Sequence, residues 1–381
     1  MLSIDKDLKK ILVVFFVYKI LILSLGTVSY YMVPDDISHK NTELENPLTR
    51  PWYQFDTRAY MNIAEKGYNY EYGTWSGGPA TTNFGWYPFY PFMIFLFGFA
   101  GHDIAAYLIP QIFSFLAVVM VYMLLKEDIT KSQARKSVFY MLLFPAAYFL
   151  TALYTESIFL FLSAATFYMA RKERWACAGI AGYFAVLTRF IGLAMFIPLL
   201  YMYIKRRGVN AKIAFIFLLP AAFVTIMAYH YFTFGDPLIQ FYTQSQFSRG
   251  IGLPHTAFVN TIAEIYSTSS PFVMFYNWFN ILTTLGFLAL LVAYWRKTPL
   301  EYNLYVLLSF FMIFSSGILA SVTRFELVLF PVFMAVSRFS ERSRAATAAV
   351  AIMFSLFFLM QILAVVNHVN GEIDFRQLLK I

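Results

Sequence analysis

Charged residues are scarce in this chain of 381 amino acids: they make up 13% of the sequence, whereas hydrophobic residues make up 60%. So small a share of charge argues against a soluble globular protein and is typical of a protein with several transmembrane segments. The single cysteine, Cys177, excludes a disulfide bond within the chain, so cysteine use indicates no redox compartment. Aromatic residues are abundant instead, at 20%.

Motifs of several soluble enzyme classes are also missing. The sequence has no P-loop, no glycine-rich dinucleotide-binding loop and no His/Glu zinc motif. The net charge of +8 would suit a nucleic-acid partner, but the basic residues lie in short runs between apolar segments. That arrangement is typical of the positive-inside rule for membrane proteins, so no nucleic-acid partner is predicted.

Apolar segments separated by short polar ones run along most of the chain. A helix needs about 20 apolar residues to cross the hydrocarbon core, and somewhat fewer where protein surrounds it. Residues 55–67 and 86–100 are predicted as juxtamembrane helices within a long first loop, 34–103. The sequence therefore predicts an all-α polytopic membrane protein, with one domain over residues 1–381 and no separate soluble domain. About eleven spans are expected, near residues 11–33, 104–125, 137–151, 156–170, 175–188, 190–204, 213–233, 272–295, 302–317, 327–337 and 345–366.

Lysine and arginine predict the orientation of these spans. A cytoplasmic N-terminus places most of the 29 basic residues on the cytoplasmic side, as the positive-inside rule requires. The first loop and the turn at Glu156 then face outwards. We expect a multi-pass cell-membrane protein, or an endoplasmic reticulum protein in a eukaryote; the lack of an Asn-x-Ser/Thr sequon favours a prokaryote. The cytoplasmic runs are Lys6–Lys10, Lys126–Lys136, Arg171–Arg174, Lys205–Lys212, Arg296–Lys297 and Arg338–Arg344.

A few charged residues lie at the predicted outer ends of spans. A charge in the hydrocarbon costs about 2.5–3.5 kcal/mol on insertion scales, so each such residue needs a reason. Asp56 precedes a helical pattern that ends at Gly67, Glu156 lies in a short turn, Arg189 divides two apolar runs, and Arg324 opens a span. A carboxylate can act as a general base on a hydroxyl, and arginines bind phosphate through paired hydrogen bonds. These residue types suggest group transfer from a lipid phosphate.

Each of these residues also has a structural interpretation. Asp56 would cap the helix that follows it, as Asp often does. Glu156 would be a solvated turn residue, and Arg189 and Arg324 would extend towards the lipid headgroups. His230, near the outer end of a span, suits a hydrogen-bonded interior histidine better than a ligand.

Residues 55–68, FDTRAYMNIAEKGY, are the first of five short motifs that follow one another along the chain. This stretch resembles the Trp-Asp-Ser-x-Trp-Tyr-x-x-Ile-Ala-x-x-Gly-Tyr stretch of the second GPI mannosyltransferase (PIG-V) family and its prokaryotic relatives, with Phe55 in place of Trp and Ala59 in place of an aromatic residue. The resemblance covers about residues 50–335. The other matching segments are NFGWYPFYP at 83–91, LYTESIF at 153–159, Arg174-Trp175 with LTRFIGL at 187–193, and FGDPL at 234–238 followed by Arg324 and Phe330-Pro331.

This resemblance implies a GT-C glycosyltransferase, an all-α membrane bundle with juxtamembrane helices in its first outer loop. The implied reaction is inverting transfer of a hexose, most often mannose, from a polyprenyl- or dolichyl-phosphate donor. The acceptor would be a glycolipid or surface glycan on the outer face. Because such a donor is already activated, neither a metal nor another cofactor is expected.

The resemblance also suggests roles for individual residues. Asp56 is expected to be the base, and Arg189 and Arg324 are expected to stabilise the leaving phosphate with help from His230. Glu156 would orient the acceptor or hold an arginine. The remaining candidates for substrate contact are Arg58, Trp86, Tyr87 and Tyr90, although the aromatic three would equally suit an interfacial belt.

The main alternative is a multi-pass lipid or solute transporter or flippase. That class favours paired inverted repeats and broken helices that meet at the middle of the membrane. The sequence shows no such pairing, and its polar candidates gather at one predicted face.

Overall fold

The computed structural model describes residues 5–70, 73–74, 80–245, 249–371 and 373. Apart from a short antiparallel hairpin of β1 (Gly73–Thr74) and β2 (Ala80–Thr81), the described residues form helices and their connections. The α-helices are α1 (Lys6–Met32), α2 (Asp56–Lys66), α3 (Phe89–Phe97), α4 (His102–Leu125), α5 (Lys131–Leu143), α6 (Glu156–Arg171), α7 (Trp175–Thr188), α8 (Phe196–Arg207), α9 (Leu218–Phe234), α10 (Ile239–Gln244), α11 (Pro254–Ser267), α12 (Pro271–Ala293), α13 (Leu300–Phe314), α14 (Val322–Val328), α15 (Phe330–Ser340) and α16 (Arg344–Val369). The 3₁₀ helices are η1 (Asp35–Ile37), η2 (Arg50–Trp52), η3 (Gly98–Ala100), η4 (Pro145–Leu150), η5 (Phe190–Met195), η6 (Ala211–Phe215) and η8 (Trp295–Lys297).

The helices confirm an all-α polytopic membrane protein. Within the described residues, α1, α4, α12 and α16 are long and apolar enough to cross a membrane by length and composition. Shorter apolar helices include α7, α9 and α13. The juxtamembrane predictions correspond to α2 and to α3 with η3. The number of complete crossings stays a prediction.

Several expected spans are interrupted rather than continuous. The segment 137–151 forms α5 and then η4, because Pro145 forces its predecessor, Phe144, into an extended conformation with ψ 141°. The segment 190–204 likewise divides into η5 and α8, and 213–233 into η6 and α9. Two elements in the loop 234–271, α10 and α11, were not predicted; both are short, and α11 carries polar residues along one side.

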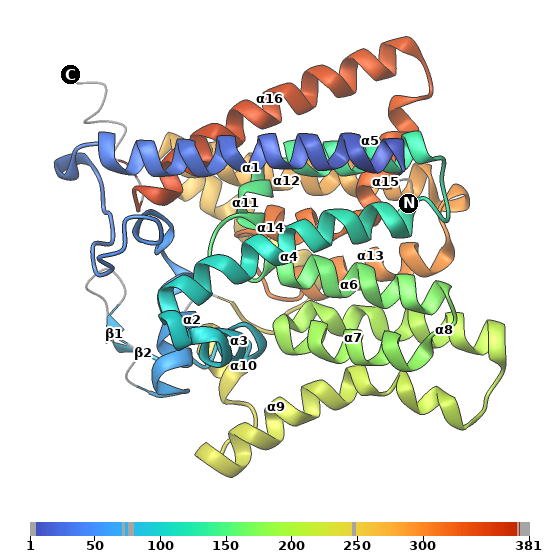
Figure 1. Cartoon of the computed structure of the whole chain (residues 1–381), viewed down its shortest axis with the longest axis horizontal. Coiled ribbons are helices and arrows are strands. Elements are labelled where there is room, and N and C mark those ends of the chain that lie inside the picture. The colour runs from blue at the N-terminus through green and yellow to red at the C-terminus, as the bar shows by residue number, and fades with distance from the viewer. Residues whose placement is uncertain (1–4, 71–72, 75–79, 246–248, 372, 374–381) are drawn as a thin grey trace.

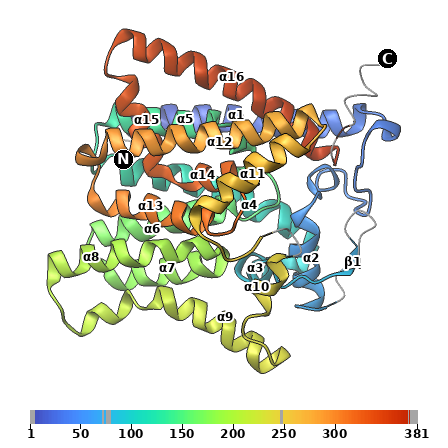
Figure 2. The same cartoon turned by 180° about the vertical axis from the view of Figure 1, so that it is seen from behind.

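Helices α1, α4 and α16 lie side by side across the molecule, above a layer formed by α6, α7 and α8 (Figure 1). Seen from behind, α11, α12 and α13 cover the opposite side (Figure 2). The first loop, α2, α3 and α10 gather at one end of the bundle, whereas the described N-terminal end of α1 lies at the other (Figure 1).

The basic runs of the sequence lie together at that second end. Arg171 forms ion pairs with both Asp128 and Glu301, each at 2.8 Å, which join the end of α6 to the connection after α4 and to the start of α13. The six runs therefore share one face, as the charge pattern predicts; which side of the membrane this face occupies stays a prediction. The further pairs at this end are Asp5–Lys131, Asp7–Arg135, Lys136–Glu341, Lys172–Glu127 and Arg207–Glu173.

Candidate functional site

Two carboxylates and two guanidinium groups form a connected cluster near the end of the bundle that carries the first loop. Glu156 Oε1 accepts hydrogen bonds from Arg189 Nη1 and from Arg324 Nε, both over 2.7 Å. Arg324 Nη1 also donates to Asp56 Oδ2 over 3.0 Å. The Glu156 side chain is fully buried, while 26% of the Asp56 side chain is exposed. The cluster thus has a buried anionic centre and an accessible carboxylate at its edge.

Aromatic rings surround the two arginines. The Arg324 guanidinium carbon lies 4.5 Å from the centre of the Phe149 ring and 4.7 Å from that of Tyr154. Arg189 lies 4.7 Å from the Phe325 ring. Rings placed over a cation attract it and exclude water, and charges act more strongly in the resulting low dielectric. Neither arginine extends freely towards lipid headgroups.

Asp56 is the first residue of α2, and a strained residue precedes it. Phe55 has φ +49° and ψ −120°, a conformation that is costly for a residue other than glycine and that occurs most often at functional sites. The Asp56 amide donates to the Tyr154 hydroxyl over 3.3 Å. Within the described part of the chain, the Asp56 carboxylate pairs with Arg324 and not with the amides of its own first turn. The helix-capping interpretation is therefore not supported.

Glu156 and Arg189 both lie where a helix begins or ends. Glu156 opens α6, and its complete burial rules out a solvated turn residue. Arg189 follows the last residue of α7 in an extended conformation, with φ −155° and ψ 138°. Gly192 lets the chain pass close to α7, because a Cβ at that position would lie 2.8 Å from the Val186 nitrogen. The motif LTRFIG thus directs the Arg189 side chain out of its helix and towards Glu156.

A third arginine, Arg249, joins this neighbourhood and was missed in the sequence. It lies between α10 and α11, and its Nη2 donates to the Ala320 carbonyl over 3.3 Å. The amide of the adjacent Gly250 donates to the Ser316 carbonyl over 3.0 Å. Burial lowers the pKa of the Arg249 guanidinium, and the nearby charge of Arg324 lowers it further. Two carboxylates and three guanidiniums leave the site with a formal charge of +1.

Other predicted site residues lie outside this cluster. Arg58 is exposed and pairs with Glu43 over 2.8 Å. His230 is fully buried among rings, with the Tyr68 and Phe84 centres 5.2 and 5.7 Å from its own, and Asp236 is its nearby charge. The structure thus places His230 in an aromatic cluster and not among the arginines.

The three aromatic candidates differ from one another in exposure. Tyr90 is fully buried and donates its hydroxyl to the Ala106 carbonyl over 2.7 Å, so it presents no free ring face. Trp86 is also buried, and its carbonyl accepts from the Tyr68 hydroxyl over 2.7 Å. Tyr87 is half-buried. Of the three, Tyr87 is the most exposed, and its contact with a substrate stays a prediction.

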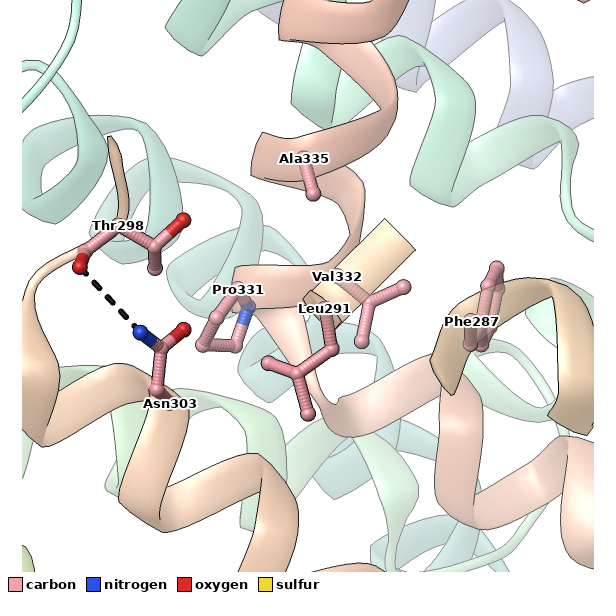
Figure 3. Close-up of a pocket in the computed structure, with 7 residues that line it drawn as sticks. All are labelled: Phe287, Leu291, Thr298, Asn303, Pro331, Val332 and Ala335. Atoms are coloured by element: carbon pink, nitrogen blue, oxygen red, sulfur yellow. Dashed lines mark hydrogen bonds between the residues drawn. The ribbon is translucent and has the colours of Figure 1, made fainter. Parts of the chain in front are cut away.

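A small pocket lies between α12, α13 and α15 (Figure 3). Asn303 donates from Nδ2 to the Thr298 carbonyl over 3.4 Å at one side of it. None of the cluster residues lines this pocket, so we do not assign it to the site. Its lining residues are Phe287, Leu291, Thr298, Asn303, Pro331, Val332 and Ala335.

A metal ion needs several ligand side chains placed close together. In the part of the chain that the structure describes, no group of three or more His, Cys, Asp and Glu side chains is placed to bind one. The expectation that no metal is needed stays a prediction.

Comparisons with known proteins give matches in structure but not in sequence. No family model and no curated protein matches the sequence. The crystal structure of ArnT from Cupriavidus metallidurans bound to undecaprenyl phosphate is similar, with 12% identity and a TM-score of 0.50 over 88% of this chain and 62% of that one. This chain has the GT-C fold. The chain spans less than two thirds of the length of ArnT.

Other structures with the GT-C fold show a weaker likeness. The Archaeoglobus fulgidus oligosaccharyltransferase in complex with Zn and sulfate has 13% identity and a TM-score of 0.43, over 92% of this chain and 53% of that one. The apo form of the same enzyme has 12% identity and a TM-score of 0.45, over 93% of this chain and 56% of that one. The GT-C part of the resemblance noted in the sequence is confirmed as a fold; the PIG-V-like family stays a prediction.

Proposed function

We propose that this chain is an inverting glycosyltransferase that moves a hexose, with mannose as the first candidate, from a polyprenyl-phosphate donor to a glycolipid or surface glycan. The observation that carries the proposal is the charged cluster of Asp56, Glu156, Arg189 and Arg324 at one end of a GT-C fold. The ArnT structure with the same fold holds undecaprenyl phosphate, a lipid of the proposed class.

In the proposed reaction, Asp56 takes the proton from an acceptor hydroxyl while that oxygen attacks the anomeric carbon of the sugar. The bond from this carbon to the phosphate oxygen breaks, and the lipid phosphate leaves with the bonding electrons. Asp56 is suited to this step because, of the two carboxylates in the cluster, its side chain is partly exposed whereas that of Glu156 is buried. A positioned general base contributes about 100-fold to 10,000-fold to a rate.

The arginines serve the leaving group. Charge grows on the phosphate as the bond breaks, and cations that are already held in place stabilise it without reorganising. Glu156 holds Arg189 and Arg324 in position. The two carboxylates balance the charge of these two arginines, so Arg249 adds one net positive charge for the phosphate. We place this site on the outer or luminal face of the membrane, in agreement with the expected orientation, with membrane lipids around the bundle.

The test uses membranes from a strain that lacks this chain, supplemented with the purified protein and radiolabelled polyprenyl-phosphate mannose. We expect release of polyprenyl phosphate and label in a glycolipid or glycan. If label is transferred only from a donor that carries another hexose, that hexose is the substrate in place of mannose, and the proposed reaction class stands. A donor that crosses the membrane intact, with no hexose released from any donor tested, would favour the transporter or flippase and overturn the proposal.

A further inference from the structure

The segment 144–155 interrupts the helices inside the bundle, just before Glu156. It contains η4 and a series of turns, and its residues Phe144, Leu150 and Thr151 are fully buried. Non-helical backbone at membrane depth persists only where protein groups satisfy its free carbonyls. The partners of these carbonyls therefore decide how the segment is held.

Three long polar side chains from three different helices supply those partners. Lys19 Nζ of α1 donates to the Leu150 carbonyl over 2.9 Å, and Gln111 Nε2 of α4 donates to the Thr151 carbonyl over 2.7 Å. At the other end of the segment, Gln361 Nε2 of α16 donates to the Phe144 carbonyl over 2.9 Å. These bonds thus hold the interrupted segment at its first residue, Phe144, and again at residues 150 and 151.

Lys19 is the unusual member of this set. It lies near the middle of α1, is 7% exposed, and also donates to Gln111 Oε1 over 2.8 Å and to Thr151 Oγ1 over 3.0 Å. No carboxylate of the described residues lies within 4.0 Å of its ammonium group. A lysine at the centre of a membrane helix is costly to insert, so its three hydrogen bonds have to offset that cost.

The residues that come after Leu150 and Thr151 in the chain form part of the candidate site. Tyr154 accepts from the Asp56 amide and contacts Arg324, and Thr155 Oγ1 accepts from Arg189 over 3.1 Å. Glu156 comes next in the chain. Any displacement of residues 150 and 151 is therefore passed to the groups that hold Asp56 and both arginines.

We propose that Lys19 is a positioning residue of the candidate site: its bonds to Leu150 and Thr151, and its bond to Gln111, which itself holds Thr151, fix the segment 150–156 and thereby place Tyr154, Thr155 and Glu156. This inference rests on the proposed function for its effect on rate, but its effect on the segment is independent of that function. A misplacement of about 1 Å in a catalytic group can cost about 100-fold in rate.

The first test compares hydrogen exchange in Lys19→Met, Lys19→Gln and a control, Lys10→Met. Methionine has a similar length but no donor, glutamine keeps two N–H donors, and Lys10 is an exposed residue of the same helix. We expect amide exchange in 150–156 to rise about tenfold or more in Lys19→Met, as local opening would produce. Exchange in α7 should stay unchanged, Lys19→Gln should be intermediate, and Lys10→Met should match the wild type.

The second test measures sugar transfer by the same variants. For Lys19→Met we expect kcat to fall about tenfold or more with a smaller change in KM for the donor, and partial recovery in Lys19→Gln. Unchanged exchange in 150–156, or a uniform rise over the whole chain, would overturn the positioning role. If Lys19→Met does not fold, the same comparison in Lys19→Gln decides. If the wild type transfers no sugar, the proposed function fails and the exchange result still decides this inference.

Discussion

Arg324 Nη1 donates a hydrogen bond to Asp56 Oδ2 over 3.0 Å, although 268 positions separate the two residues in the sequence. The contact joins the start of α2 in the first loop to α14 in the last part of the chain. It places the proposed base against a cation proposed to stabilise the leaving phosphate. The site therefore depends on tertiary packing.

Asp56→Asn should abolish sugar transfer and leave the fold intact. Asparagine is nearly isosteric with aspartate and the Asp56 side chain is partly exposed, so the fold should tolerate the change, but an amide cannot take a proton. We expect transfer to fall about 100-fold or more, as removal of a general base does. The rate should be measured with the polyprenyl-phosphate donor, and the fold by the elution profile and melting temperature in detergent. Near-normal turnover would show that Asp56 is not the base.

Glu156→Gln should destabilise the protein strongly. The buried carboxylate is the shared acceptor of Arg189 and Arg324, and a glutamine leaves both cations without their buried anion. Breaking a buried ion pair on one side costs about 3–5 kcal/mol. Thermal unfolding in detergent measures the effect.

Glu326→Gln is the matched control for that experiment. Glu326 is equally buried, but its hydrogen-bond partner is the Thr284 hydroxyl over 2.7 Å, and none of the ion pairs of the described chain includes it. An uncharged isostere removes no ion pair there, so we expect a change within about 1 kcal/mol or a gain in stability. Equal losses in the two variants would contradict the special role of Glu156.

Arg249→Ala should weaken donor binding with little effect on stability. The carbonyl of Ala320 is its hydrogen-bond partner in the described chain, so removing the side chain leaves no buried carboxylate unpaired. Hydrogen bonds to a charged group contribute about 1.5–3 kcal/mol, which corresponds to about 10-fold to 100-fold in the dissociation constant of polyprenyl phosphate. The control is Arg58→Ala, which removes an exposed arginine paired with Glu43. The same affinity in both variants would exclude Arg249 from the phosphate site.

Gly192→Ala should lower both stability and transfer. The added methyl group would meet the backbone of α7 at 2.8 Å from the Val186 nitrogen, and backbone cannot move aside as a side chain can. Overpacking costs about 1–3 kcal/mol, and the shift would displace Arg189 three residues earlier. Gly286→Ala is the control, because a Cβ there meets no atom within 4 Å. A melting temperature equal to that of the control would contradict the close approach.

The local parts of the site could be predicted from the sequence because they depend on neighbouring residues. The helical pattern after Asp56 and the apolar runs on each side of Arg189 indicated α2, α7 and the break between α7 and η5. The interruption at η4 was missed although Pro145 is a local signal for it; the side chains of α1, α4 and α16 that hold the interrupted segment are remote in the sequence. Arg249 was missed for the same reason: its segment has no apolar period, and its neighbours come from other helices.

Three features could be predicted from the amino-acid pattern alone: the membrane environment, the gathering of the basic runs at one end of the bundle, and a short list of charged residues that are costly in hydrocarbon. They follow from hydrophobicity and from the cost of charge in hydrocarbon, which act on each segment separately. Which of those charges meet is set by the tertiary structure. It paired Asp56 with Arg324 and both arginines with Glu156, added Arg249, and left His230 among aromatic rings. Ion pairs between distant segments depend on a few ångströms of helix packing, and no local pattern in the sequence specifies them.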